Sequence, residues 1–139
     1  MIFSYGLFLC ILIIGIYFVY IRPKINVFNT FQSDPNFTNY MLIIESNKEF
    51  DLTNYEKAMK HLKLFLMYYS QSFNDESMFD KMKNQHHEII KYLNRMMFSI
   101  PNSMRRYIYM KNAIENLDII CKKYLKEIAE KYEITYFQI

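Results

Sequence analysis

Glycine is nearly missing from this chain of 139 residues. Its two glycines, Gly6 and Gly15, both lie in an apolar N-terminal run, so the chain beyond Ile21 has none, and the whole chain has only three prolines. β-Sandwiches and barrels need many turns with positive φ, which glycine adopts most easily. Glycine-rich phosphate loops and the nucleophile elbow of hydrolases are excluded for the same reason. The composition therefore predicts an all-α fold.

Strong net charge, cysteine pairs and metal motifs are also lacking. The formal net charge is only +3, without a concentrated basic patch, so we expect no nucleic-acid partner. Cys10 and Cys121 lie in segments of different character and imply no disulfide framework. The three histidines do not follow the H-E-x-x-H spacing of zinc proteases. We therefore expect no cofactor, no metal site, no small-molecule substrate and no enzymatic activity.

The longest uncharged run lies at the N-terminus. Residues 2–21 carry no charged side chain, and a helix of this length spans about 30 Å, the thickness of the hydrocarbon core. Arg22-Pro23-Lys24 then supplies two cations and a helix-stopping proline. The pattern predicts that residues 1–22 form a single transmembrane anchor. The side chains assigned to this anchor are Ile2, Phe3, Leu7, Leu12, Ile16, Val19, Arg22 and Lys24.

A cleaved signal peptide is the alternative interpretation of this run, but it needs a basic start and a small-residue cleavage site, and neither is present. Because the cations follow the apolar run, the rest of the chain is predicted to stay on the cytoplasmic side. The glycosylation sequon Asn36-Phe37-Thr38 points the other way. With either orientation of the predicted anchor, the lipid bilayer is the first expected partner.

Residues 23–52 are predicted to be a tether with a short apolar element. This element covers about Thr38 to Glu45, and its apolar run is too short to distinguish a helix from a strand. Phe28 and Phe31 are unusual in a flexible linker, so we expect them to rest on the bilayer surface or to pack on the domain.

Residues 53–139 are predicted to form an antiparallel bundle of about three helices with an apolar tail. Thr53 and Glu56 read as the capping box of the first helix, which runs to about Phe73. The second helix ends near Phe98, before Ser99-Ile100-Pro101. The third runs from about Pro101 to Tyr132. Its predicted apolar stripe is Met104, Ile108, Ala113, Ile114, Leu117, Ile120, Cys121, Tyr124, Leu125 and Ile128.

Aromatic residues make up 18% of the chain, and such side chains are favoured at protein interfaces. Tyr136 and Phe137 in the tail lie outside the three stripes, as do Phe28 and Phe31. Arg105 and Arg106 could contact headgroups or an acidic partner surface. The candidate partner-binding residues are therefore Phe28, Phe31, Arg105, Arg106, Tyr136 and Phe137. His86 falls on the second stripe and is expected to be half-buried.

The layout resembles that of a known group of viral proteins. The apolar N-terminus and the Arg22-Pro23-Lys24 stop are followed by Phe65-Leu66-Met67-Tyr68-Tyr69-Ser70, Tyr92-Leu93-Asn94-Arg95, Ser99-Ile100-Pro101 and a closing lysine-rich helix. This arrangement is similar to small membrane-anchored minor virion proteins of large nucleocytoplasmic DNA viruses. The resemblance implies a structural protein that links an inner membrane to a capsid shell and binds other structural proteins. The alternative is a single-pass membrane adaptor that recruits a soluble partner.

Overall fold

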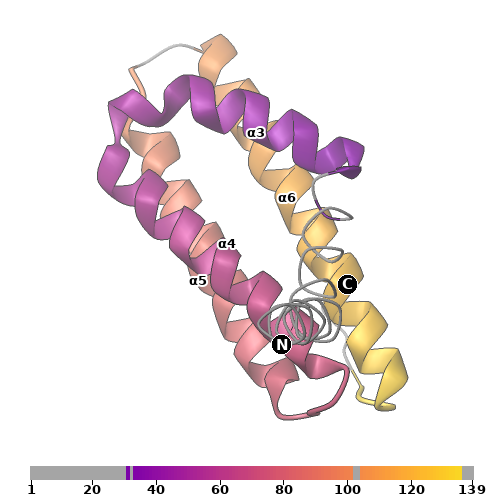
Figure 1. The fold of residues 1–139 in the computed structure, drawn as a ribbon. Helices are drawn as coiled ribbons and strands as arrows, with labels where there is room; N and C mark the ends of the chain where they lie inside the picture. Colours follow the sequence, from indigo (N-terminus) through magenta and orange to yellow (C-terminus); the bar gives the residue numbers. More distant parts are fainter. Residues whose placement is uncertain (1–30, 32, 102–103, 136–139) are drawn as a thin grey trace, which may run out of the picture.

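The computed structural model describes residues 31, 33–101 and 104–135, which form four long helices (Figure 1). These are α3 (Pro35–Asn47), α4 (Leu52–Ser72), α5 (Met78–Ser99) and α6 (Met104–Lys131), and a 3-10 turn, η2 (Lys48–Phe50), joins α3 to α4. Within these residues every secondary-structure element is helical, so the predicted all-α class is confirmed. The bundle has one helix more than the three predicted.

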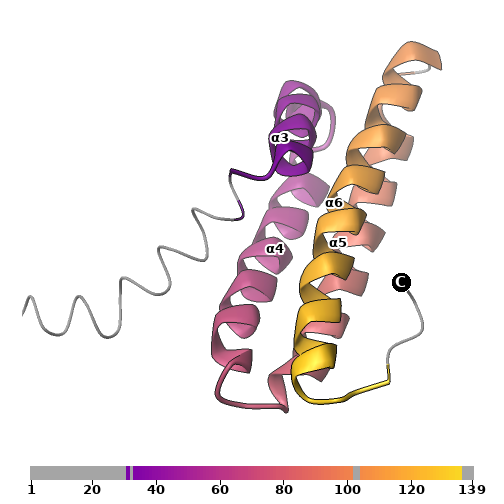
Figure 2. The same cartoon turned by 90° about the vertical axis from the view of Figure 1, so that its right-hand side faces the viewer.

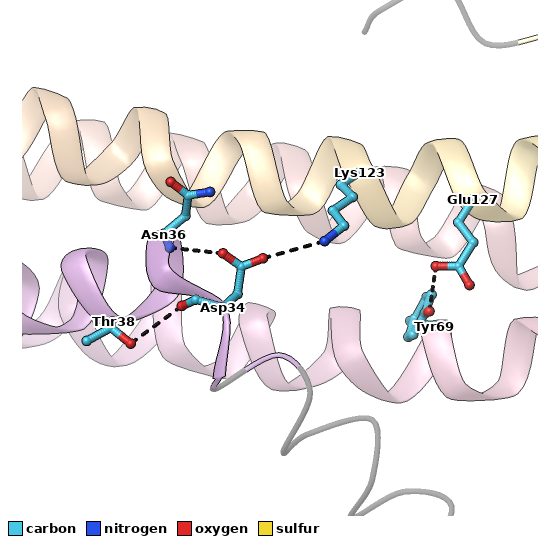
Figure 3. Close-up of polar contacts among 6 residues, drawn as sticks. All are labelled: Asp34, Asn36, Thr38, Tyr69, Lys123 and Glu127. Atoms are coloured by element: carbon cyan, nitrogen blue, oxygen red, sulfur yellow. Dashed lines mark hydrogen bonds and ion pairs between the residues drawn. The ribbon is translucent and has the colours of Figure 1, made fainter.

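The additional helix is α3, which lies in the segment predicted to be a tether. Pro35 occupies its first turn, where a missing N–H costs nothing, and the side chain of Asp34 accepts a hydrogen bond from the Asn36 backbone N–H at 2.9 Å (Figure 3). Tyr40 and Ile44, one turn apart, are fully buried. Residues 35–50 therefore belong to the folded bundle and not to the predicted tether.

The start of α4 also differs from the prediction. Asp51, not Thr53, is the N-cap, because its carboxylate accepts a hydrogen bond from the Asn54 backbone N–H at 3.1 Å. The same carboxylate accepts a second bond from the Ser99 hydroxyl at 2.7 Å, which ties α4 to the end of α5. Thr53 lies inside the helix, so the predicted capping box is wrong. The predicted ends of α5 and α6 agree with the structure to within a few residues.

The lack of glycine shows at the end of α6. Glu133 has a φ of 55°, the left-handed conformation that usually ends a helix at glycine. The Ile134 N–H donates to the Ala129 carbonyl at 2.8 Å and closes the cap, and the half-buried Ile134 side chain packs against the core. The described beginning of the predicted apolar tail therefore lies on the bundle.

The helices pack as two antiparallel pairs (Figures 1 and 2). α4 lies along α5, α3 lies along α6, and α5 also contacts α6. We call the end that holds η2 and the start of α6 the apical end, and the end that holds the α4–α5 turn the distal end. The fully buried large side chains are Phe31, Tyr40, Ile44, Phe65, Met82, Ile89, Leu93, Met96, Met110, Leu117, Ile120 and Leu125.

The predicted transmembrane anchor, residues 1–22, lies outside the described residues. Among the helices that the structure does describe, none has the length and apolar character needed to cross a bilayer.

Candidate functional site

The predicted site residues fall into three groups. Arg105 and Arg106 lie in the first turn of α6, and both are exposed at the apical end. Phe31 is buried. The others lie outside the described residues, so their predicted roles stay predictions. These are Ile2, Phe3, Leu7, Leu12, Ile16, Val19, Arg22, Lys24, Phe28, Tyr136 and Phe137.

The prediction that Phe31 is free for a partner is wrong. Its ring is fully buried, 4.7 Å from the Phe37 ring in an edge-to-face contact and 5.6 Å from the Tyr124 ring in a stacked contact. Nearby, Lys123 Nζ lies 3.7 Å from the Asp34 carboxylate, and the Tyr69 hydroxyl donates to Glu127 at 2.7 Å (Figure 3). Phe31 and Asp34 are thus held against the C-terminal third of α6.

An apolar and basic surface lies at the apical end. Residues 104–109, the first turn and a half of α6, are all exposed, and Met110 is the first buried residue of that helix. Phe98 is 80% exposed and Met104 is 74% exposed. We define the apical surface as Phe98, Met104, Arg105, Arg106, Tyr107 and Ile108.

Placing Met104 and Ile108 on the buried stripe of α6 is therefore incorrect. Both keep the helical spacing, but the start of α6 projects beyond the neighbouring helices (Figure 2), and no residue that the structure describes buries them. The sequence reasoning missed these two residues, and Phe98, as surface residues. The pair Arg105-Arg106 between Met104 and Ile108 is the signal that could have found them, because two cations on one turn oppose burial of that turn.

A second apolar surface follows the two helices that diverge from η2. A hollow of about 550 Å³ lies on α4 and another of about 420 Å³ lies on α3. We call the two together the α3–α4 groove. It is lined by Phe37, Thr38, Met41, Leu42 and Glu45 on α3, and by Tyr55, Glu56, Met59, Lys60, Lys63, Leu64 and Met67 on α4.

The two hollows meet at a hydrogen bond between helices. The Tyr55 hydroxyl donates to the Glu45 carboxylate, and Lys48 pairs with Glu45 at 3.0 Å. Partial burial and this carboxylate raise the pKa of Tyr55 to about 12, so the phenol stays protonated and remains a donor. The hydrogen bond therefore joins α3 to α4 between the two hollows.

A polar cluster joins α5 to α6. His86 Nε2 lies 2.7 Å from Asp118 Oδ1, and Lys122 Nζ lies 2.8 Å from Asp118 Oδ2. The His86 side chain is 13% exposed, so its predicted half-buried position on the second stripe is confirmed. Burial lowers the pKa of His86, and Asp118 opposes this only in part. The imidazole is therefore mostly neutral at pH 7 and acts as a structural hydrogen-bonding group.

The titration of His86 predicts a pH-dependent stability. An unfolded histidine has a pKa near 6.5. Below that value the unfolded chain binds a proton that folded His86 does not, so the free energy of unfolding should fall as pH decreases from about 6.5 towards the lower folded pKa. The slope contributed by one such proton is at most about 1.4 kcal/mol per pH unit. Urea unfolding of residues 22–139 between pH 5 and 8 measures it.

The control is the neighbouring histidine. His86→Gln should flatten this slope, while His87→Gln, on the exposed side of α5, should leave it unchanged. Equal slopes in the parent and the His86→Gln variant would show that His86 is protonated equally in the folded and unfolded chains.

Cys121 lies one turn of α6 beyond Leu117 and is fully buried. Burial raises the pKa of its thiol, so the reactive thiolate is disfavoured. Its described surroundings are those of a packed core thiol, as the sequence predicted. Among the residues that the structure describes, no three His, Cys, Asp or Glu side chains are grouped as a metal ion would require.

Comparison with known proteins adds no relationship. No protein-family model, no characterised protein and no solved structure matches this chain.

Proposed function

We propose that this protein is a non-enzymatic structural protein, held in a membrane by its N-terminal segment, whose helical bundle binds a second structural protein. A minor virion component that links an inner membrane to a protein shell fits this description. The observation that carries the proposal is the α3–α4 groove, an open apolar surface on an otherwise well-packed bundle.

The chemistry of the groove favours a helical occupant. Three methionines line it, Met41, Met59 and Met67, and flexible thioether side chains adapt to the irregular surface of a partner. Charges of both signs flank these side chains, with Glu45 and Glu56 near one end of the α4 hollow and Lys60 and Lys63 further along. An amphipathic helix of a partner protein, with an apolar stripe bordered by opposite charges, would match this arrangement.

Site-specific crosslinking in the native setting tests the proposal. A photoreactive amino acid at Met67, in the groove, should crosslink to one other structural protein in purified particles. The same residue at Asn84, exposed on α5, should not. Crosslinking to a soluble protein that is missing from particles would instead support the membrane adaptor.

Substitution gives the quantitative test. Leu42 is 69% exposed and Met67 is 38% exposed, so the double change Leu42→Glu and Met67→Glu should leave the helical content unchanged. Two carboxylates in an apolar interface should lower the amount of protein in particles by about tenfold, equivalent to about 1.4 kcal/mol of binding. Asn84→Glu is the matched control. If the double variant were incorporated into particles at the normal level, the groove would be excluded as the binding surface.

A further inference from the structure

The apical surface has the composition of a membrane-contacting surface. Phe98 at the end of α5 and Met104, Tyr107 and Ile108 at the start of α6 are exposed apolar or aromatic side chains. The start of α6 projects beyond the other described helices (Figure 2). Arg105 Nε lies 3.4 Å from the Tyr109 hydroxyl, and the Arg106 guanidinium lies 5.0 Å from the Phe50 ring centre. Apolar and aromatic side chains interleaved with arginine are typical of segments that lie in the headgroup region.

The charges at the two ends of the bundle differ in sign. Residues 95–111 contain four cations and no carboxylate, namely Arg95, Arg105, Arg106 and Lys111. The α3–α4 connection adds Lys48, Glu49 and Asp51, and Lys48 pairs with Glu45 at the end of α3. With these residues counted, five cations face three carboxylates, so the apical end is net positive. The distal end is net negative, with Asp75, Glu76, Asp80, Glu127, Glu130 and Glu133 against Lys81, Lys83, Lys126 and Lys131.

We propose that the apical surface inserts its apolar side chains into the headgroup region of an anionic bilayer, the same bilayer that holds the N-terminal anchor. This inference rests on the proposed membrane anchoring. It adds a second contact, which orients the bundle with its distal end away from the lipid. Anionic lipid attracts the apical end and repels the distal end, so the charge asymmetry alone favours this orientation over the reverse.

The length of the chain before α3 is compatible with both contacts. Phe31 is fixed beside Tyr124, and Tyr124 lies twenty positions beyond Met104 on one continuous helix, a distance of about 30 Å. The seven steps from Lys24 to Phe31 span at most about 25 Å. The anchor and the apical surface can therefore meet one bilayer if α6 is inclined to the membrane normal rather than upright.

Site-directed fluorescence on the full chain in vesicles tests this inference. Cys10 and Cys121 are replaced by serine and alanine, and an environment-sensitive fluorophore is attached at Met104→Cys or, in a second variant, at Phe98→Cys. The control is Asn74→Cys in the α4–α5 turn at the distal end. In phosphatidylcholine vesicles that contain phosphatidylserine, the two apical labels should be blue-shifted and quenched by brominated lipid, and the distal label should not.

Replacing the two arginines tests whether anionic lipid holds the apical surface at the bilayer. Each arginine at an anionic surface favours contact about fivefold, so Arg105→Gln with Arg106→Gln should lower the ratio of inserted to free apical end by roughly tenfold or more. The same labels should be much less quenched without phosphatidylserine. Apical labels as water-exposed as the distal label, in a chain that stays in the vesicles, would overturn the inference and leave the apical surface to a protein partner.

Alkaline carbonate extraction of the same vesicles separates this result from failure of the anchor. A chain that resists extraction is anchored whatever the labels report. A chain that is extracted, but whose apical labels are quenched before extraction, contradicts the proposed anchor and supports the apical contact. Extraction with unquenched labels contradicts both. Circular dichroism of each labelled variant confirms that the helices are intact.

Discussion

Replacing Phe31 by alanine should lower the free energy of unfolding by about 3–5 kcal/mol. The ring is fully buried, and it contacts both Phe37 on α3 and Tyr124 on α6. Removing it takes apolar surface out of the core and leaves a cavity that two aromatic neighbours cannot easily fill. A small domain has a total stability of only about 5–15 kcal/mol, so this change approaches the stability of the whole bundle.

Urea unfolding of residues 22–139, followed by circular dichroism, measures the effect. Phe98→Ala is the matched control, because it removes the same ring from a position that is 80% exposed, and it should change stability by less than about 0.5 kcal/mol. If Phe31→Ala cost no more than Phe98→Ala, the segment before α3 would not be packed on α6, and the short tether assumed for the apical contact would be lost.

The importance of Phe31 shows where sequence reasoning was limited. An aromatic residue in a polar segment can bind a partner or pack on its own domain, and local sequence does not distinguish the two. The decision depends on Tyr124, nearly a hundred positions later in the chain. Contacts between residues so far apart leave no local signal.

The helices differed in how well they could be predicted. α4, α5 and α6 each place apolar residues three or four positions apart, so their existence and approximate ends followed from the periodicity. α3 has four apolar residues in succession, 41–44, of which Leu42 is exposed and Ile44 is buried. Such a run gives no period, and the helix is stabilised by burial of Tyr40 and Ile44 against α6 rather than by its own pattern.

The candidate surfaces were predicted only in part. Arg105 and Arg106 stood out because paired cations follow a turn, but their apolar neighbours Met104 and Ile108 continue the buried stripe in sequence. Periodicity shows which face of a helix is apolar, but not where the neighbouring helices end. The α3–α4 groove could not be predicted, because it depends on the angle between two helices, one of which the sequence did not identify.

The two surfaces suit different tasks in one protein. The apical surface is basic and includes Phe98 and Met104, the two most exposed large hydrophobic side chains of the described residues, which suits the proposed contact with a fluid anionic layer. The α3–α4 groove is a shallow apolar surface that includes three methionines and is bordered by both signs of charge, which suits the proposed contact with a structured helix. A protein that links a membrane to a protein layer needs both kinds of contact.

Replacing Tyr40 by phenylalanine should raise the free energy of unfolding by about 1–3 kcal/mol. Tyr40 is fully buried on α3, and within the described part of the chain its hydroxyl has no hydrogen-bond partner. Burial raises the pKa of this phenol, which therefore stays neutral but remains without a partner. A buried hydroxyl that loses water and gains no hydrogen bond costs free energy, and phenylalanine keeps the ring while removing that cost.

The same chemical change at Tyr69 should have the opposite sign. The Tyr69 hydroxyl donates to the Glu127 carboxylate at 2.7 Å, so Tyr69→Phe removes a charge-assisted hydrogen bond and should cost about 1–2 kcal/mol (Figure 3). Both variants are measured by urea unfolding of residues 22–139 at pH 7, where neither phenol titrates. The comparison cancels the common effect of losing one hydroxyl and leaves the difference between a satisfied and an unsatisfied group. Destabilisation by Tyr40→Phe would show that the Tyr40 hydroxyl has a hydrogen-bond partner in the folded protein, and α3 would then be held by a polar contact as well as by its apolar face.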